Sequence, residues 1–530
     1  MPIRMTDDKN QGRPSQRPGG NMRGGSGGGG LGSLLPMILG FLIKKPKLLL
    51  VVVVVGALFY FLGGSEGCAG GGGGNIASQV LQLATGANFS PELYDKTEVF
   101  EPLADNVNAP LPEKASLQQF APQRRNQGQQ GSCVAWASAY AARTIVQAQA
   151  TKQEPDRAAF SPSFMYNQIK IDNSDCQGSY IKRAMDQMKG GGALPFSQFA
   201  YTDRSCSQRP SEEELQSAEQ YRIKGFQRLT DGDRADSPVD LLAMKQQLAQ
   251  GSPVVIGMMV GGSFMQAMAG EEKWYPAQND YGMPGFGGHA MCVIGYDDFK
   301  FGKEGGFQIM NSWGPEWGKN GIAWESYGDF AHFTKEAYAV YPQGEGVDVR
   351  PSTFDVRFGL QLVDENGDPS GEHIALRHTG GRTFRTDRPI AKGTRFKVEV
   401  TNNTECYLYC FGQETDGSSY ILFPNTPKHS PYCGITGTRI FPSDQSMKAD
   451  DVGDADVMAV LVYGQSVDFP RIDEALKRST ATGLAARIDD VLGKELVAPG
   501  SLTYAQGSTF GVQGPATQAG LALVIEIEKR

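Results

Sequence analysis

The sequence predicts a multi-domain protein of the α+β class: one transmembrane helix, a central domain of helices and strands, and a β-sandwich-like C-terminal domain. Three observations support this prediction. An uncharged apolar run covers residues 48–62, Ala-rich and strand-like segments alternate over residues 111–342, and short β-like runs recur after residue 352. The chain has 530 residues and is 40% apolar and 20% charged. This composition supports folded cores and excludes wholesale disorder, and the length suits several domains.

The charge distribution sets the N-terminal tail apart from the rest of the chain. The whole chain has a formal net charge of −8, which argues against nucleic-acid binding because phosphate neutralisation needs clustered Lys and Arg. Residues 1–47, in contrast, carry eight basic and two acidic side chains, a net charge of +6. Gly-rich runs such as residues 24–30 bury too little apolar surface to offset the entropy of ordering. We therefore expect residues 1–47 to be a disordered, Gly-rich, basic tail.

The apolar run that follows predicts a membrane anchor at residues 48–65. As a helix, its fifteen core residues rise about 22 Å, short of the roughly 30 Å hydrocarbon layer. Including residues 63–65 and letting Lys45 and Lys47 reach the headgroups closes most of that gap. A cleaved signal peptide is the alternative, but the basic region is long and a small-residue cleavage site is lacking. A second apolar stretch, residues 31–43, contains a proline, and we interpret it as interfacial rather than as a second span.

The basic flank of this anchor also predicts an orientation. Basic residues favour the cytoplasmic side, so the tail is expected in the cytoplasm and everything after the anchor outside it, in a periplasmic or extracellular space. Residues 66–110 begin with a glycine run and are expected to form a stalk and linker. The sequence thus predicts a single-pass protein of the bacterial envelope.

The chemistry of the chain is concentrated in three segments of the central domain. Cys133 lies where the Gly-rich RNQGQQGS meets an Ala-rich helical stretch, and a helix N-terminus lowers the pKa of a thiol. His289 follows a glycine pair at the start of an apolar run, and Asn311 ends another such run. A cysteine nucleophile, a histidine base and an amide to orient that base form a catalytic arrangement. From its own segment alone, a buried structural cysteine is an equal alternative for Cys133.

With these segments in view, residues 111–342 resemble the papain-like (C1) cysteine peptidases. The blocks LPEKASLQQF, QGQQGSC, GGHAMCVIGY and NSWGPEWGKNG carry the resemblance. It implies a two-lobed domain, with a helical lobe and a β-barrel-like lobe, that cleaves protein or peptide substrates without a metal or an organic cofactor. By position, Cys133 matches the nucleophile, His289 the base and Asn311 the orienting amide. Gln127 matches the side-chain donor of the oxyanion hole, and Trp313 matches the indole that covers the Asn–His contact.

The sequence also departs from the family pattern. Gln130 occupies the position of a common half-cystine, so Cys176 loses its usual partner, and the resemblance of Cys206 to another half-cystine implies the pair Cys176–Cys206. Val134 replaces an aromatic residue beside the nucleophile. These changes indicate a divergent, bacterial-type member. Residues 75–110 lack the pattern of the family's long helical propeptide.

The C-terminal third is predicted to be rich in β-structure. After a linker at residues 343–352, near-alternating runs and an Asp-Gly turn at residues 416–417 predict hairpins within a domain covering residues 353–530. The segment resembles a bacterial β-domain of unknown function, whose ligand or protein partner the sequence does not name. Residues 474–494 favour an amphipathic helix packed on this domain. The cysteines allow either one disulfide, joining Cys433 to another cysteine of this domain, or free thiols only.

These observations predict a membrane-anchored cysteine peptidase that works through a Cys133–His289–Asn311 thioester mechanism. Two alternatives stay open. One is a catalytically silent papain-fold scaffold that only binds. The other is a transpeptidase that passes the acyl group of the same intermediate to an amine.

Overall fold

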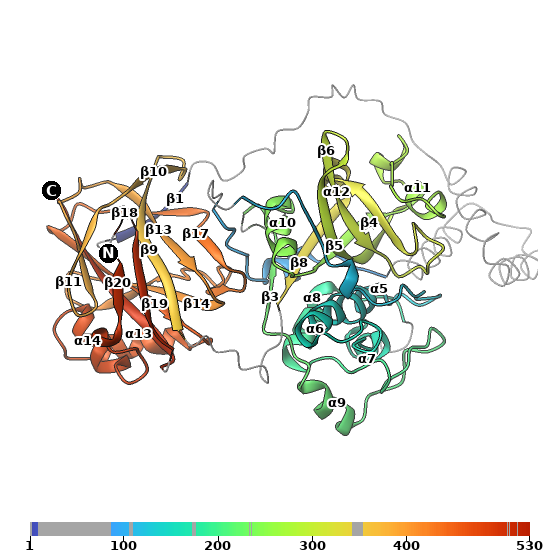
Figure 1. Ribbon diagram of the computed structural model, residues 1–530, viewed down its shortest axis with the longest axis horizontal. Coiled ribbons are helices and arrows are strands. Elements are labelled where there is room, and N and C mark those ends of the chain that lie inside the picture. The colour runs from blue at the N-terminus through green and yellow to red at the C-terminus, as the bar shows by residue number, and fades with distance from the viewer. Residues whose placement is uncertain are drawn as a thin grey trace, which may run out of the picture.

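The chain forms two domains joined by segments from its N-terminal part (Figure 1). A computed structural model describes residues 3–8, 86–104, 110–171, 176–232, 234, 236–341, 353–505, 507, 509–516 and 518–530. The central domain divides into a helical and a sheet lobe, and one continuous buried cluster extends through both lobes. The C-terminal domain has its own core between two sheets. The predicted α+β class therefore matches the arrangement of helices and sheets.

A long central helix organises the helical lobe. It runs from Cys133 to Thr151 as α5 (Cys133–Ala135), the π-helical η3 (Trp136–Arg143) and α6 (Thr144–Thr151). Its Ala-rich sequence without Gly or Pro favours a helix, and small side chains let neighbouring helices pack closely. The other helices of this lobe are α7 (Pro162–Ile169), α8 (Ile181–Gly190) and α9 (Glu212–Glu219). Because α7 and α8 pack against η3, the start of the central helix is held in a fully buried position.

An antiparallel sheet forms the second lobe. Its strand order is β3-β8-β4-β5-β6-β7, and β2 pairs with β5. The strands are β2 (Lys114–Ser116), β3 (Phe226–Arg228), β4 (Val254–Val260), β5 (Gly287–Phe301), β6 (Glu304–Met310), β7 (Ile322–Ser326) and β8 (Thr334–Val340). Three helices accompany them: α10 (Leu241–Ala249), α11 (Gly262–Gln266) and α12 (Tyr327–Phe333). Helix α5 packs against β5, so the nucleophile segment and the histidine segment meet where the two lobes join.

The C-terminal domain is a two-layer β-structure, as the sequence predicts. One sheet has the order β1-β18-β13-β9-β21-β20 with β10 and β17 at its side, and the other has β11-β12-β22-β19-β14-β15 with β16 on β14. The strands of the first sheet are β1 (Ile3–Asp7), β9 (Thr353–Val363), β10 (Pro369–His373), β13 (Arg395–Asn402), β17 (Gly437–Phe441), β18 (Gln445–Ala449), β20 (Thr503–Ala505) and β21 (Phe510–Pro515). Those of the second are β11 (Leu376–Gly380), β12 (Thr383–Thr386), β14 (Cys406–Gln413), β15 (Ser419–Phe423), β16 (Tyr432–Cys433), β19 (Ala455–Tyr463) and β22 (Gly520–Glu528).

The second sheet is buried on both faces. Val460 of β19 faces the other sheet, while its neighbour Leu461 faces two helices, which explains why this strand is apolar at successive positions. The helices are α13 (Phe469–Arg478) and α14 (Leu484–Leu492). The predicted helix at residues 474–494 is therefore packed on the domain, but it is two helices, because Gly483 and its neighbours interrupt it. The cysteines of this domain are free buried thiols, and Cys406 and Cys433 lie opposite each other on paired strands.

The first residues of the chain belong to the C-terminal domain. Strand β1 (Ile3–Asp7) pairs antiparallel with β18, and Ile3 is buried. The Asp8 carboxylate lies 2.7 Å from both Arg395 Nη2 and Lys397 Nζ. The prediction of a disordered tail is therefore wrong for residues 3–8. Alternating apolar side chains and the buried ion pairs of Asp8 fix these residues in the sheet. The rest of that tail lies outside the described residues.

A second N-terminal segment, residues 86–104, connects the two domains, and we call it the strap. It contains the short helix α4 (Pro91–Asp95), and Figure 1 shows it in blue between the two domains. The predicted stalk and linker at residues 66–110 is therefore wrong for the strap, whose Tyr94 and Phe100 are buried. Among the described residues, the helices are all too short or too polar to cross a membrane, and the predicted anchor at residues 48–65 lies outside them.

Candidate active site

The predicted nucleophile occupies the first position of the central helix. Cys133 follows Gly131 and Ser132, and its side chain is fully buried. Its Sγ accepts a hydrogen bond from the backbone N–H of Ala290 at 3.4 Å. Ala290 directly follows His289 on β5, so this contact ties the nucleophile of one lobe to the histidine strand of the other.

The predicted base and its orienting amide are in direct contact. His289 Nε2 lies 2.7 Å from Asn311 Oδ1, and both side chains are buried. The indole of Trp313 stacks on the imidazole with a ring separation of 4.4 Å and an interplanar angle of 24°. These three side chains therefore form a compact group, in which the hydrogen bond with Asn311 and the face of Trp313 help to fix the imidazole.

Gln127 lies beside this group and is held from two directions. Its Oε1 accepts a hydrogen bond from Ser312 Oγ at 2.7 Å, and its Nε2 donates to the carbonyl of Gln130 at 3.0 Å. An amide held in this way presents its N–H groups to the loop that leads into Cys133. The structure thus places Gln127 on the turn before Cys133, with one Nε2 hydrogen bonded to the Gln130 carbonyl.

The protonation state of the thiol differs from the sequence-based prediction. Burial raises the pKa of Cys133 to about 12, although backbone hydrogen bonds from Ala290 and Val134 act in the opposite direction. The prediction of a lowered pKa is therefore wrong for this arrangement. Loss of water around the sulfur outweighs the helix N-terminus, because a buried thiolate is strongly disfavoured without a compensating charge.

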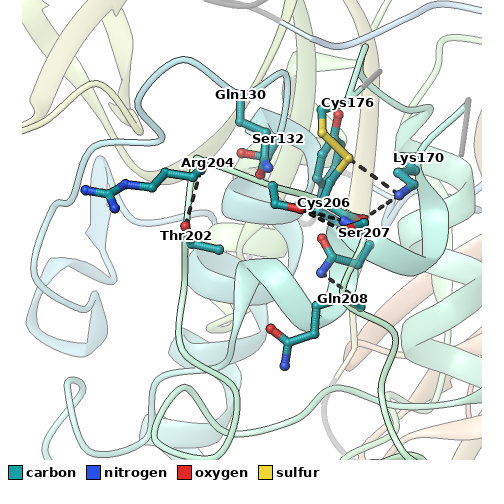
Figure 2. Close-up of a disulfide and its surroundings, with 12 residues drawn as sticks. Gln130, Ser132, Lys170, Cys176, Thr202, Arg204, Cys206, Ser207 and Gln208 are labelled. Carbon is teal, nitrogen blue, oxygen red and sulfur yellow. Dashed lines mark hydrogen bonds between the residues drawn. A yellow bond between two sulfur atoms is a disulfide. The ribbon is translucent and has the colours of Figure 1, made fainter. Parts of the chain in front are cut away.

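The pair Cys176–Cys206 is a disulfide, with an S–S distance of 2.03 Å and a Cα–Cα distance of 5.9 Å. Figure 2 shows the buried ammonium of Lys170 next to it, where Nζ donates to the carbonyl of Cys206 and lies 3.5 Å from its sulfur. The loop of Cys176 packs closely on Gly131, since a Cβ at Gly131 would lie 3.1 Å from the Cys176 carbonyl oxygen. The disulfide thus supports the turn that precedes the nucleophile.

Comparison with known proteins agrees with this geometry. Residues 113–342 match the model of the papain family cysteine proteases. Residues 113–342 are a papain-like peptidase domain. Residues 390–461, within the C-terminal domain, match a domain of unknown function, DUF4384.

Individual relatives resemble the peptidase domain at modest identity. An uncharacterized peptidase C1-like protein of Acanthamoeba polyphaga mimivirus is 28% identical over 203 residues, covering 37% of this chain and 61% of that protein. Mouse cathepsin K is 27% identical over 203 residues, covering 38% and 54%. The chain thus spans little more than half the length of these relatives. Among solved structures, xylellain, a cysteine protease from Xylella fastidiosa, is 24% identical with a TM-score of 0.42, covering 50% of this chain and 97% of that one.

The strap lies along the peptidase domain beside Cys133 and His289, which the sequence did not predict. Ser179 donates its N–H to the carbonyl of Gly86, and its own carbonyl accepts the N–H of Asn88, both at 2.9 Å. On the opposite side, the N–H of Ala87 donates to the carbonyl of Gly288 at 3.0 Å. The strap therefore pairs with the helical lobe through Ser179 and with the sheet lobe through Gly288.

These contacts lie directly beside Cys133 and His289, the pair that the sequence predicts to be catalytic. Gly288 precedes His289, and Gly86 packs on Gly131, two residues before Cys133. Gly86 has a φ of +87°, and a Cβ there would lie 2.4 Å from the Gly131 carbonyl oxygen. Only glycine fits this position, since any side chain would be strained and would collide with backbone. The full burial of Cys133 and His289 thus coincides with a strap that lies against both of their segments.

The strap also fills a side-chain site with Phe89. The ring lies over Gly257 of β4, where a Cβ would be 2.6 Å from Phe89 Cε1 and 3.1 Å from Ile181 Cδ1. The next residue, Ser90, caps α4 by accepting the N–H of Leu93 at 3.3 Å. The Ser-Pro pair at residues 90–91 is a helix-start signal in the sequence, but it indicates only a short helix and not where that helix lies.

Over the described ranges, no three His, Cys, Asp or Glu side chains lie close enough together to bind a metal ion.

Proposed function

We propose that the protein is a cysteine peptidase that hydrolyses peptide bonds through a thioester acyl-enzyme. The observation that carries this proposal is the 2.7 Å contact between His289 Nε2 and Asn311 Oδ1. An amide oxygen can only accept a hydrogen bond, so Nε2 carries the hydrogen in this contact and Nδ1 is the nitrogen that can take a proton from Cys133. The stacked indole of Trp313 limits the access of water to this contact.

The proposed reaction has two halves. His289 Nδ1 takes the thiol proton, Cys133 Sγ attacks the carbonyl carbon, and the imidazolium returns the proton to the amine as the C–N bond breaks. A water then loses its proton to His289 and attacks the thioester, releasing the acid and the thiol. The backbone N–H of Cys133 and the side chain of Gln127 stabilise the oxyanion in both halves, and losing one such donor typically costs about 100- to 1,000-fold in rate.

An extended protein or peptide chain is the proposed substrate. The support is that Ser179 and Gly288 each hydrogen-bond the main chain of the strap on opposite sides of the catalytic pair. The same backbone groups suit the main chain of a substrate. Phe89 rests on Gly257 beside Ile181, which favours substrates with a large apolar side chain at this position.

The test uses the full chain with Gly86→Ala, which forces the strap away from Gly131, and follows alkylation of Cys133 by iodoacetamide from pH 5 to 9. Adding His289→Ala in the same chain should abolish rapid alkylation near neutral pH and abolish hydrolysis of an unfolded protein substrate. If alkylation follows an ordinary thiol titration with or without His289, and no substrate is cleaved, the peptidase proposal is wrong.

A silent scaffold is the second candidate, and the complete burial of Cys133 and His289 favours it. The alkylation experiment decides between the peptidase and the scaffold, because a scaffold would gain no His289-dependent reactivity when the strap is displaced.

A transpeptidase would give the same alkylation profile as the peptidase. It would differ by transferring the acyl group to an added amine in preference to water.

We also propose that the apolar residues 48–65 attach the protein to a membrane. The support is their composition and the basic residues that precede them, since they lie outside the described part of the chain. The pairing of β1 with β18 requires both strands to lie on the same side of that membrane. A single span between residues 8 and 86 would put these two strands on opposite sides of the membrane. The predicted N-cytoplasmic single-pass orientation and this pairing therefore exclude each other.

A further inference from the structure

The second half of the strap joins the peptidase domain to the C-terminal domain. Val99 forms a bridge to Arg228 of β3 on one side and to His429 of the C-terminal domain on the other. The N–H of Val99 donates to the carbonyl of Lys428 at 2.7 Å, and the N–H of Phe100 donates to the carbonyl of Arg228 at 3.0 Å. The strap thus continues the backbone pairing from the peptidase sheet to the loop before β16.

Charged side chains strengthen the contact with the C-terminal domain. The buried Glu101 carboxylate lies 3.1 Å from His429 Nδ1 and accepts the N–H of Ser443 at 3.0 Å. The Glu101 carbonyl accepts Arg439 Nε at 3.2 Å. Hydrogen bonds to charged, buried groups are among the stronger ones in proteins. We call the residues that hold Glu101 and Val99 the clamp: Lys428, His429, Arg439 and Ser443.

The two halves of the strap differ in how they are held. At the catalytic pair, Gly86 and Ala87 contribute backbone hydrogen bonds and almost no side-chain surface. In the clamp, the buried Glu101 carboxylate contacts His429 and the N–H of Ser443, and its backbone carbonyl accepts from Arg439. Fixing one part of a chain raises the effective concentration of the adjoining part at its own site. Phe89, which lies against Gly257, and the buried Tyr94 also hold the strap on the peptidase domain. The clamp adds to these contacts and so favours the position of Gly86 and Ala87 beside Cys133 and His289.

We infer that the C-terminal domain, through the clamp, holds the strap over the catalytic residues and thereby inhibits the peptidase domain. The inference rests on the proposed function, because only a working Cys133–His289 pair has an activity to inhibit. Substrate main chain and strap compete for the same backbone groups of Ser179 and Gly288. Whatever separates the C-terminal domain from the strap would then activate the enzyme.

The experiment measures the rate of Cys133 alkylation by iodoacetamide in the full chain. We expect Glu101→Gln and His429→Ala each to increase this rate about tenfold, the effect of losing one charged buried hydrogen bond. Both substitutions disrupt the Glu101–His429 contact, and His429→Ala also removes the contact of His429 Nε2 with Asp444 at 3.6 Å. The double variant should therefore be no faster than His429→Ala alone. Additive increases, or none, would overturn the role of this contact.

Two controls separate the clamp from other effects. Lys224→Met removes the ion pair of Lys224 Nζ with Glu405 Oε1 (2.8 Å), which joins the domains outside the strap, and should leave the alkylation rate unchanged. Gly270 has a φ of +80° like Gly86, but nothing lies within 4 Å of a Cβ there, so Gly270→Ala strains the backbone without a collision. We expect rapid alkylation in Gly86→Ala and the wild-type rate in Gly270→Ala.

The outcomes distinguish the inference from the proposed function. If Gly86→Ala is alkylated no faster than the wild type, the strap does not cover the thiol and the inference is wrong. If Gly86→Ala is fast but the clamp variants match the wild type, or if Lys224→Met is as fast as they are, the clamp is wrong. If the clamp variants are fast but alkylation is independent of His289 and no peptide is cleaved, the proposed function fails while the clamp still stands as a holder of the strap.

Discussion

Ser312 orients two of the amides on which the proposed chemistry depends. Its Oγ donates to Gln127 Oε1 at 2.7 Å, and its backbone N–H donates to Asn311 Oδ1, also at 2.7 Å. The first contact fixes the orientation of the Gln127 amide, and the second holds the Asn311 oxygen that accepts the hydrogen bond from His289. One residue next to Asn311 thus links the oxyanion donor to the orientation of the base.

The Gln127 contact can be tested alone, since Ser312→Ala removes the hydroxyl and keeps the backbone N–H. In the Gly86→Ala chain, we expect this change to lower kcat about tenfold with little change in KM, because it misplaces a donor used in the transition state. Gln127→Ala should cost about 100- to 1,000-fold. Steady-state kinetics of the double variant provide the check. If Ser312 acts through Gln127, the double variant is no slower than Gln127→Ala, whereas multiplied losses would contradict this positioning role.

Glu336 of β8 gives the peptidase domain a specific pH dependence. Burial raises the pKa of this carboxyl from 4.5 to about 7, although Tyr338 Oη and the N–H of Ser90 donate to it. The folded state therefore holds the proton more tightly than the unfolded state. This stabilisation is complete below pH 4.5 and is lost as the pH rises through 7.

We expect the free energy of unfolding to fall by about 3 kcal/mol between pH 4.5 and 8 on account of Glu336. Glu336→Gln cannot ionise and should remove this part of the pH dependence, so that the variant gains relative stability at pH 8. Urea unfolding at pH 5 and pH 8, followed by the fluorescence of the peptidase domain, measures the difference. Parallel losses of stability in the variant and the wild type would assign the pH dependence to other groups.

At the scale of elements, the sequence predicts those that carry side-chain signals. Composition or periodicity predicts three of these elements: the loop-to-helix change at Cys133, the strand before Asn311 and the hairpin at residues 416–417. The strap near Cys133 has no such signal, because Gly86 and Ala87 bind through backbone groups that every residue possesses. Strand β1 could not be predicted for another reason. It has five residues within a polar, Gly-rich segment, and these are too few to show the alternation of a strand.

The disulfide-bearing loop is the element whose loss should be most visible in stability. Cys176 and Cys206 are 30 residues apart, and closing a loop of that length is expected to stabilise the fold by about 3–4 kcal/mol. We expect the variant with both cysteines changed to serine to unfold at a lower urea concentration, with a free energy of unfolding smaller by about 3–4 kcal/mol. Lys170 keeps its hydrogen bond to the carbonyl of residue 206 in that variant. An unchanged midpoint would show that Lys170 and packing suffice to hold the loop.

At the scale of the whole molecule, the order of segments in space differs from their order along the chain. Strand β1 extends a sheet of the C-terminal domain, and the strap runs between both domains before the peptidase domain begins (Figure 1). The C-terminal domain thus holds two segments that precede the peptidase domain. A membrane anchor between β1 and the strap must enter and leave on one side for both contacts to exist.

If residues 48–65 enter a membrane, as proposed, the pairing of β1 with β18 predicts the topology of the protein. Arg4 of β1 and Lys448 of β18 are register partners on the domain surface, and paired residues on adjacent strands are close enough for a disulfide. We expect the full chain with Arg4→Cys and Lys448→Cys to form this cross-link in its native membrane, detected by peptide mapping, while each single variant does not. If β1 and β18 are instead on opposite sides, the cross-link is absent in membranes and forms only after detergent extraction. That result would support the single-span orientation with a cytoplasmic N-terminus. The pairing of β1 with β18 would then occur only in protein released from the bilayer.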